Sequence, residues 1–371
     1  MRKRPGRPVG SNVRDDVSTP QSVWSSRTDS RVPSITGNGT AEVAGRLLRL
    51  LTSGQYRKAS VSEADRDALF RSLYPTLIRQ VRTRAPIQLT LMAFPFKVPN
   101  PAKTGSRTLP DFAELSAIRR LLELARRVRA IYPAGLRIEI IHDGRFLADL
   151  FGVPAEAVAA YEAHFRRLVE LVGLRDVITS HDFESLQRAN GLTASEEAIA
   201  RLEDEAVEWY HCTRGSPVWL ECFRKTLGMV SLRHLPLEVA DTVLEAGARN
   251  ALADRFPHIE ALVHQAMIDY RVKDAVIHRF DPRPVAFPEA IHTTTRRQPG
   301  RLALWLIRRG QGLLPWHGVG AIDTDANPRV MLARDVAKRP ELRPMFLPGE
   351  TTPFCFGAEH HSHLLVRLLS P

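Results

Sequence analysis

The fold is decided by residues 87–142, where IQLTLMAF (87–94), DFAELSAIRRLLELARRVRAI (111–131) and LRIEIIH (136–142) follow one another. The first and third stretches are short apolar runs that end at a proline or at the turn Asp143-Gly144, which is typical of buried strands. Between them, apolar residues recur at helical spacing. Strand, helix and strand in this order predict a parallel sheet with helices on its faces.

The same alternation continues beyond residue 142. Residues 153–173 (VPAEAVAAYEAHFRRLVELVG) predict a helix, with Pro154 near its start and Gly173 at its end, and residues 174–183 (LRDVITSHDF) predict a third strand. Strand character returns at 301–309 (RLALWLIRR) and 319–322 (VGAI). We therefore predict an α/β fold with a Rossmann-like, mostly parallel sheet that is flanked by helices, and with additional helical segments.

The chain divides into a tail and one domain. Residues 1–40 carry seven Lys/Arg and three Asp/Glu among many Ser, Pro, Gly and Thr, which predicts a disordered basic tail. Its segment Arg4-Pro-Gly-Arg-Pro8 is reminiscent of minor-groove-binding hooks, and a solvated tail is the alternative. Residues 41–371 form a single α/β domain in this prediction, with a helical N-terminal layer (41–85) and a helix-rich segment (195–275).

Composition narrows the class of protein. A chain of 371 residues with 44% hydrophobic residues can bury a large core, and it contains no apolar run of the roughly 18 residues that a spanning helix needs. The N-terminus lacks a secretory signal, and Cys212, Cys222 and Cys355 show no disulfide or zinc spacing, so we expect a cytoplasmic protein without membrane association. The net charge of +11 suits nucleic acid or an anionic small molecule. Oligomeric state is not predicted.

Ligands of open parallel sheets bind beyond the carboxyl ends of the strands, so the loops there supply the candidate residues. Lys97 follows the first strand between two prolines. It could pair with a phosphate or carboxylate, or form an imine with a ketone, and an ordinary surface lysine is the alternative.

Acidic and basic candidates occur near the next strands. Asp111 and Glu114 have the spacing of a helix-capping arrangement, so capping alone competes with a role for Asp111 in substrate binding. Asp143 suits a turn as well as a site. Arg145 is either a surface charge or a bidentate anion clamp.

The later loops supply histidines and arginines. His317 lies in Pro-Trp-His-Gly, where the adjoining Trp316 and Gly318 favour a ligand contact and a neutral imidazole could move protons near pH 7. His292 is a second proton-transfer candidate. It precedes a cluster suited to a phosphorylated substrate or to a solvated basic face, formed by Arg296, Arg297 and Arg301. Zinc, iron, Walker and Rossmann GxGxxG motifs are missing from the sequence, so no metal or nucleotide site is predicted.

Four ordered segments resemble the isocyanide (isonitrile) synthases, also called the pyoverdine/dityrosine biosynthesis family. They are LMAFPFKVPN (91–100), TLPDFAELSAIRRL (108–121), IYPAGLRIEIIHDGRFLADLFGVPAEAVAAY (131–161) and LLPWHGVG (313–320). The sequence departs from the family at FPEAIHTTTRR (287–297), where an IRLSIH-like strand is usual. It also departs at Arg301, where a lysine is common, and at TTPFCFGAEH (351–360).

The resemblance implies an isonitrile synthase of secondary metabolism. Such an enzyme condenses the α-amine of an amino acid, commonly tyrosine or tryptophan, with the ketone of ribulose 5-phosphate, and it needs no metal or redox cofactor. An iron- and 2-oxoglutarate-dependent oxygenase is the implied partner. The catalytic candidates are then Lys97, His317, His292 and Asp143, and the substrate-binding candidates are Arg145, Asp111, Arg296, Arg297, Arg301 and Trp316. The alternatives are a diverged enzyme acting on another amine or phosphosugar, and a non-catalytic binding protein.

Overall fold

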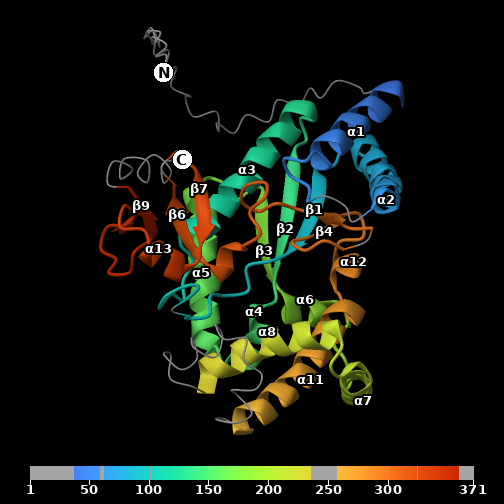
Figure 1. Ribbon diagram of the computed structural model, residues 1–371. Coiled ribbons are helices and arrows are strands. Elements are labelled where there is room, and N and C mark those ends of the chain that lie inside the picture. The colour runs from blue at the N-terminus through green and yellow to red at the C-terminus, as the bar shows by residue number, and fades with distance from the viewer. Residues whose placement is uncertain are drawn as a thin grey trace, which may run out of the picture.

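The computed structural model describes residues 37–58, 62–100, 102–234, 257–298, 300–323 and 325–358 (Figure 1). Its first elements are α1 (Gly37–Leu51), α2 (Glu63–Arg82), β1 (Ile87–Met92), α3 (Phe112–Ile131), β2 (Leu136–His142), α4 (Gly144–Phe151), α5 (Ala155–Leu171), β3 (Ile178–Asp182) and α6 (Phe183–Ala189). The chain continues with α7 (Glu196–Thr213), α8 (Pro217–His234), α11 (Pro257–Arg279), α12 (Arg283–Ala286), β4 (Ile291–Thr294) and β5 (Leu302–Ala303). The last elements are the 3-10 helix η1 (Pro315–His317), β6 (Val319–Ile322), β7 (Pro328–Met331), α13 (Ala333–Ala337), β8 (Arg343–Met345) and β9 (Cys355–Gly357).

The central sheet has the strand order β3-β2-β1-β4-β5, and every neighbouring pair is parallel. This arrangement, flanked by helices, confirms the predicted α/β fold (Figure 1). Strand order reverses between β1 and β4, because the chain moves outward from β1 through β2 to β3 and then returns to the other side of β1. Doubly wound sheets bind their ligands at the carboxyl ends of the strands beside such a reversal. A ligand-binding site is therefore expected at the loops after β1 and β4.

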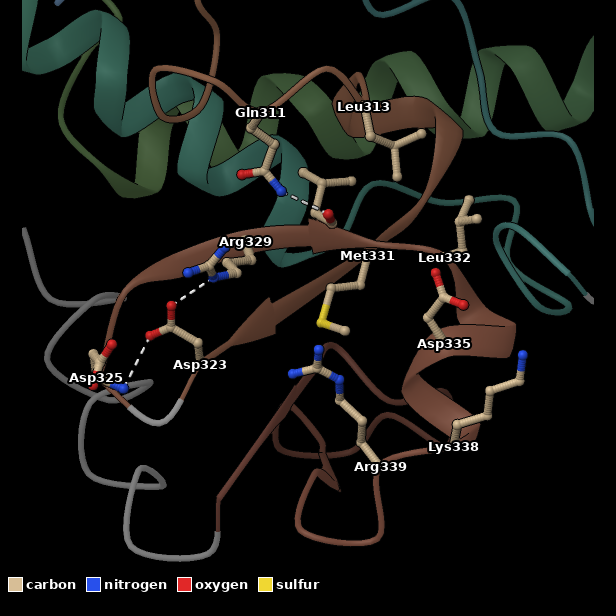
Figure 2. A pocket seen from close by; sticks show the side chains of 11 residues that line it. Gln311, Leu313, Asp323, Asp325, Arg329, Met331, Leu332, Asp335, Lys338 and Arg339 are labelled. Carbon is tan, nitrogen blue, oxygen red and sulfur yellow. Dashed lines mark hydrogen bonds and ion pairs between the residues drawn. The ribbon is translucent and has the colours of Figure 1, made fainter.

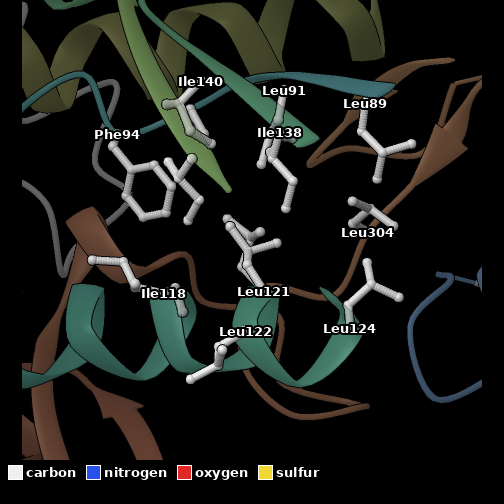
Figure 3. Packing of buried hydrophobic residues seen from close by; sticks show 14 of the residues in the cluster. Leu89, Leu91, Phe94, Ile118, Leu121, Leu122, Leu124, Ile138, Ile140 and Leu304 are labelled. Atoms are coloured by element: carbon white, nitrogen blue, oxygen red, sulfur yellow. The ribbon is translucent and has the colours of Figure 1, made fainter. Parts of the chain in front are cut away.

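Helix α3 covers one face of this sheet. Side chains of Leu89, Leu91, Ile138 and Ile140 point toward Ile118 and Leu121 of the helix, and Leu122 lies on another side of α3 (Figure 3). All but Leu122 are at most 2% exposed, and each such side chain contributes roughly 1.5–3 kcal/mol relative to an exposed one. The apolar faces of α3 and of strands β1 and β2 thus pack into one core.

Helix boundaries follow the sequence signals. Ser62 accepts a hydrogen bond from the Asp65 backbone amide at the start of α2, and Asp111 forms a complete capping box with Glu114 at the start of α3. Gly173 has a φ of 69° just after α5, the left-handed conformation that glycine adopts without strain. The helix ends predicted at Asp111 and Gly173 are confirmed.

A second sheet was not predicted. Its strand order is β7-β6-β9-β8, with antiparallel pairs at both ends and a parallel pair between β6 and β9. Strand β6 packs against the N-terminal end of α3, so this helix lies between the two sheets (Figure 1). A Cβ atom on Gly320 would lie 2.5 Å from the Ala113 backbone nitrogen, so only glycine permits this approach. The strand predicted at 319–322 is confirmed as β6, but it belongs to this second sheet and not to the parallel one.

Two predicted boundaries also need correction. Only Leu302–Ala303 of the predicted strand 301–309 forms a strand of the sheet, and Leu304 adds an isolated bridge with Arg57. Leu304, Leu306 and Ile307 are buried in the core. Their burial in the core explains the apolar pattern. Helix α1 begins at Gly37, so the predicted tail 1–40 ends too late, and the rest of it (1–36) lies outside the described residues.

The helix-rich segment is confirmed where the structure describes it. Helices α7, α8 and α11 pack on one another around their own apolar cluster, which includes Trp219, Phe223 and Val263. Residues 235–256 lie outside the described part. No described helix is long and apolar enough to cross a membrane.

Candidate active site

The carboxyl ends of the parallel strands bring several predicted residues to one edge of the sheet. Asp143 directly follows β2, and Arg296 and Arg297 lie in the loop after β4. A Cβ atom on Gly144 would lie 2.1 Å from the Pro95 carbonyl oxygen, so the start of α4 approaches the loop after β1 very closely. This contact holds Asp143 beside the reversal of strand order.

Asp143 carries the clearest chemical signal. It occupies the N-cap position of α4 but makes no capping hydrogen bond, and its buried Oδ1 has no hydrogen-bond partner among the described residues. Burial raises the pKa of this carboxyl to about 6, against the opposing influence of its own backbone amide, Arg296 and Arg283. A carboxyl group in this state can exchange a proton close to neutral pH. Turn formation alone does not explain an unpartnered acid.

His142 lies beside Asp143, and its role was not predicted although its loop was noted. Its Nδ1 lies 2.8 Å from the Phe94 carbonyl oxygen and therefore donates the hydrogen bond. Burial lowers the pKa of the imidazole to about 4, although this hydrogen bond favours the charged form. The ring is thus neutral near pH 7, and its buried Nε2 has no described partner.

Arg145 has protein carboxylates as its partners. Its Nη2 lies 3.4 Å from Glu162 Oε2, and its Nε lies 3.9 Å from Asp182 Oδ2. The side chain is 48% exposed, so these contacts are weak ion pairs near the surface. Both the surface-charge and the anion-clamp interpretations of Arg145 stay open.

Lys97 is fully buried, so the surface-lysine alternative was wrong. Its Nζ lies 2.8 Å from Asp111 Oδ2, 3.0 Å from Glu114 Oε2 and 3.0 Å from the Gly318 carbonyl oxygen. The three hydrogens of the ammonium group thus have three acceptors. We call the residues around it the ion cluster: Lys97, Arg107, Asp111, Glu114 and Tyr161.

The pKa values of the two acids in the ion cluster are shifted in opposite directions. Arg107 Nη1 lies 2.5 Å from Asp111 Oδ2, and Tyr161 Oη donates to Glu114 Oε1 at 3.1 Å. Burial would raise the pKa of Asp111, but Lys97 and Arg107 outweigh it and lower that pKa. Burial raises the pKa of Glu114 to about 7, with Lys97 opposing the rise and Asp111 adding to it. Asp111 is therefore both a helix cap and the counter-ion of two buried cations, and the catalytic role of Lys97 stays a prediction.

The segment before β6 brings His317 to the same region. Trp316 packs edge-on against Phe94, with ring centroids 5.2 Å apart, at the end of β1. Surrounding protein atoms lower the pKa of His317, and Lys103 and Arg296 lower it further, yet solvent still reaches the side chain.

His292 lies within the sheet rather than beyond it. It pairs in register with Thr90 of β1, and its Nδ1 lies 2.9 Å from Thr90 Oγ1. Burial, followed by Arg283, lowers the pKa of His292. Arg283 was not predicted; it is buried, binds Asp281 at 2.7 Å and donates to the Thr293 carbonyl oxygen.

The basic cluster predicted after β4 contains Arg296, Arg297 and Arg301. Within the described residues, none of these three side chains has a carboxylate at ion-pair distance, and Arg296 influences the pKa values of both Asp143 and His317. Asp143, Arg296 and His317 thus form one electrostatically connected group. Sequence signals for His142 and Arg283 were absent, because no spacing distinguishes them from core residues.

Two other features bear on ligands. No group of three or more His, Cys, Asp or Glu in the described residues could hold a metal ion, and the His-rich run 359–363 lies outside them. A cavity of about 690 Å³ lies on the second sheet, where Asp323 pairs with Arg329 beside Met331 (Figure 2). None of the predicted site residues lines this cavity.

Fold and site together define an α/β protein with an acid, imidazoles and arginines at the carboxyl edge of a parallel sheet. Residues 77–216 match the family model described as pyoverdine/dityrosine biosynthesis protein. The chain is 26% identical to the isocyanide synthase xanB of Aspergillus fumigatus over 73% of its own length and 37% of the relative's. It is 33% identical to the L-tyrosine isonitrile synthase of Pseudomonas aeruginosa over 31% of its length and 35% of the relative's.

A solved structure shows the same fold. The PvcA protein from Pseudomonas aeruginosa matches with a TM-score of 0.59 and 23% identity, over 85% of this chain and 99% of the other. The resemblance predicted from the sequence is confirmed by the match of residues 77–216 to this family model and by the isonitrile synthases among the similar proteins. The chain spans little more than a third of the length of these curated relatives.

Proposed function

We propose that the protein is an isonitrile synthase that converts the α-amino group of an amino acid to an isonitrile, with ribulose 5-phosphate as co-substrate. Tyrosine and tryptophan are the leading amino acids, because relatives of this chain are named L-tyrosine and L-tryptophan isonitrile synthases. The observation that carries the proposal is the Asp143 carboxyl at the sheet edge, which has a buried Oδ1 without a described partner and a pKa that Arg296 influences.

The reaction requires an acid, a base and a cationic group that binds the phosphate. Formation of an imine from amine and ketone requires an acid that helps water to leave, and the later carbon–carbon fragmentation requires a base. Asp143 supplies an acid and base with a pKa of about 6, and the neutral imidazoles of His317 and His292 supply further proton acceptors. Arg296 and Arg297 supply positive charge for a phosphate.

The remaining parts of the proposal follow from the family resemblance. The reaction uses no metal or redox cofactor. The proposed cytoplasmic location rests instead on the three cysteines, which lack disulfide spacing. An iron- and 2-oxoglutarate-dependent oxygenase on a separate chain modifies the product.

Mass spectrometry tests the proposal directly. Purified protein is incubated with ribulose 5-phosphate and each proteinogenic amino acid in turn, and the expected product has an isonitrile in place of the amino group. Asp143→Asn should abolish this product. The matched control Asp149→Asn lies on the same helix, where Asp149 binds Lys273 at the surface, and should retain it. Absence of an isonitrile with every amino acid, from folded wild-type protein, would refute the proposed activity.

A further inference from the structure

A segment from the N-terminal part of the chain pairs with the chain at the end of β5. Residues 56–58 lie antiparallel to residues 303–305: the Trp305 amide donates to the Tyr56 carbonyl at 2.7 Å, and the Lys58 amide donates to the Ala303 carbonyl at 2.8 Å. Arg57 and Leu304 form the bridge between these two bonds. The segment after α1 is thus fixed to the chain just beyond β5, next to the loop after β4.

This pairing fixes the side chain of Lys58 beside the basic cluster. Its Nζ donates to the Thr295 carbonyl oxygen at 2.6 Å, directly before Arg296, and lies 4.9 Å from the centroid of the Trp305 ring. The side chain is half-buried. Burial lowers the pKa of Lys58, and Arg297 and Arg296 lower it further. Three cations from two distant segments therefore share one small region.

The region contains more positive charge than the described residues neutralise. Lys58, Arg296 and Arg297 have no ion-pair partner among the described residues, although Arg296 acts to lower the pKa of Asp143. Bringing cations together without counter-ions costs free energy, and a ligand with two negative charges recovers it. A phosphate monoester carries such charge and several strong acceptor oxygens.

We propose that Lys58, Arg296 and Arg297 form the binding site for the phosphate group of a phosphate monoester. This inference rests on the proposed function in that it names the site of the sugar phosphate, and it adds Lys58 to the residues considered so far. The Lys58 ammonium still has two hydrogens beyond the one bound to Thr295, so it can donate to a phosphate oxygen without leaving its place. Because the three cations lie beyond β4 and β5, the phosphate would lie at the sheet edge and the ketone could extend toward Asp143.

Equilibrium binding tests the site without requiring turnover. Isothermal titration calorimetry measures the Kd of ribulose 5-phosphate for the wild type, Lys58→Met and Lys58→Arg, and unphosphorylated ribulose serves as the second ligand. Loss of a hydrogen bond to a charged group should raise the Kd of the phosphorylated ligand by about tenfold to a hundredfold in Lys58→Met. Lys58→Arg keeps the charge and should lie closer to the wild type. Affinity for unphosphorylated ribulose should be equal in all three proteins.

A matched control and a fold check complete the design. Lys338→Met makes the same change at an exposed lysine on the wall of the second-sheet cavity, and should leave the Kd of ribulose 5-phosphate unchanged. Circular dichroism shows whether each variant is folded. If Lys58→Met misfolds, Arg297→Gln, which changes an exposed side chain, replaces it and should weaken binding by a similar factor.

Each outcome separates this inference from the proposed activity. An unchanged Kd in folded Lys58→Met and Arg297→Gln, or absence of phosphate-dependent binding in the wild type, overturns the phosphate site even when isonitrile is formed. Lys58-dependent binding of the phosphorylated ligand without any isonitrile supports the phosphate site and refutes the synthase proposal. Equal loss of affinity for ribulose with and without phosphate also overturns the inference, because Lys58 would then contact another part of the ligand.

Discussion

Replacing Asp143 by Asn should make the protein more stable and inactive. The folded protein holds this carboxyl at a pKa of about 6, compared with an ordinary value of 3.8, because it is buried with an unpartnered oxygen. Asn has nearly the same shape and no charge, so it removes the cost of burying a carboxylate. A difference of this size corresponds to at most about 3 kcal/mol of unfolding free energy.

The sign of the effect depends on pH. Below about pH 3 the carboxyl is protonated in both folded and unfolded protein, so Asp and Asn should be nearly equal. Between pH 4 and 6 the unfolded chain releases a proton that the folded protein keeps, and the wild type loses stability as pH rises. Above pH 7 the full difference is present, and the Asn variant should be the more stable protein.

Urea unfolding at a series of pH values measures this difference. The free energy of unfolding of Asp143→Asn minus that of the wild type should rise with pH through about 6 and then level off. The control Asp149→Asn removes an acid that binds Lys273 near the surface, and should lose at most about 1 kcal/mol in the alkaline range. A difference that is independent of pH, or an Asn variant less stable than the wild type at pH 8, would refute the assignment of Asp143 as a buried, unpaired acid.

Three further outcomes follow from the same contacts. Lys97→Met leaves the acids of the ion cluster without their shared cation and should lower the unfolding free energy by about 3–5 kcal/mol, measured in urea. Gly320→Ala forces a Cβ atom against Ala113 and should lower the melting temperature, whereas Gly312→Ala, where a Cβ atom meets open space, should not. If isonitrile formation uses Asp143 as a base, kcat/KM should fall as pH decreases through about 6, and a profile that is flat from pH 5 to 8 would contradict that role.

Sequence reasoning succeeded where the signal is local. β1, β2 and α3 lie within two residues of their predicted bounds, because each has the period of its own structure and ends at a proline, a turn or a capping residue. The caps at Ser62 and Asp111 involve partners three residues away. Such contacts can be inferred from a stretch of sequence alone.

Sequence reasoning failed for contacts whose two residues are far apart in the chain. Of the second sheet, only β6 was predicted as a strand, because the strands of that sheet have three or four residues each and are too short for a clear period. Strand β6 pairs with residues about ten and thirty-five positions further on. Lys97 contacts Gly318 across 221 residues, and Lys58 contacts Thr295 across 237. The sequence could identify Lys97 as unusual, but its burial and the position of Lys58 depend on tertiary contacts that no spacing reveals.

The position of Lys97 changes how a loss of activity in its variants should be interpreted. Its ammonium binds the carbonyl oxygen of Gly318, the residue directly after His317, and also binds two acids at the start of α3. Removing the cation therefore disturbs the segment that carries His317 as well as any direct chemistry. A loss of kcat in Lys97→Ala is evidence for direct participation only if the unfolding free energy and the His317 proton resonance are retained. A shifted His317 resonance together with lost activity would instead assign the effect to the ion cluster, which links the two sheets beside the site.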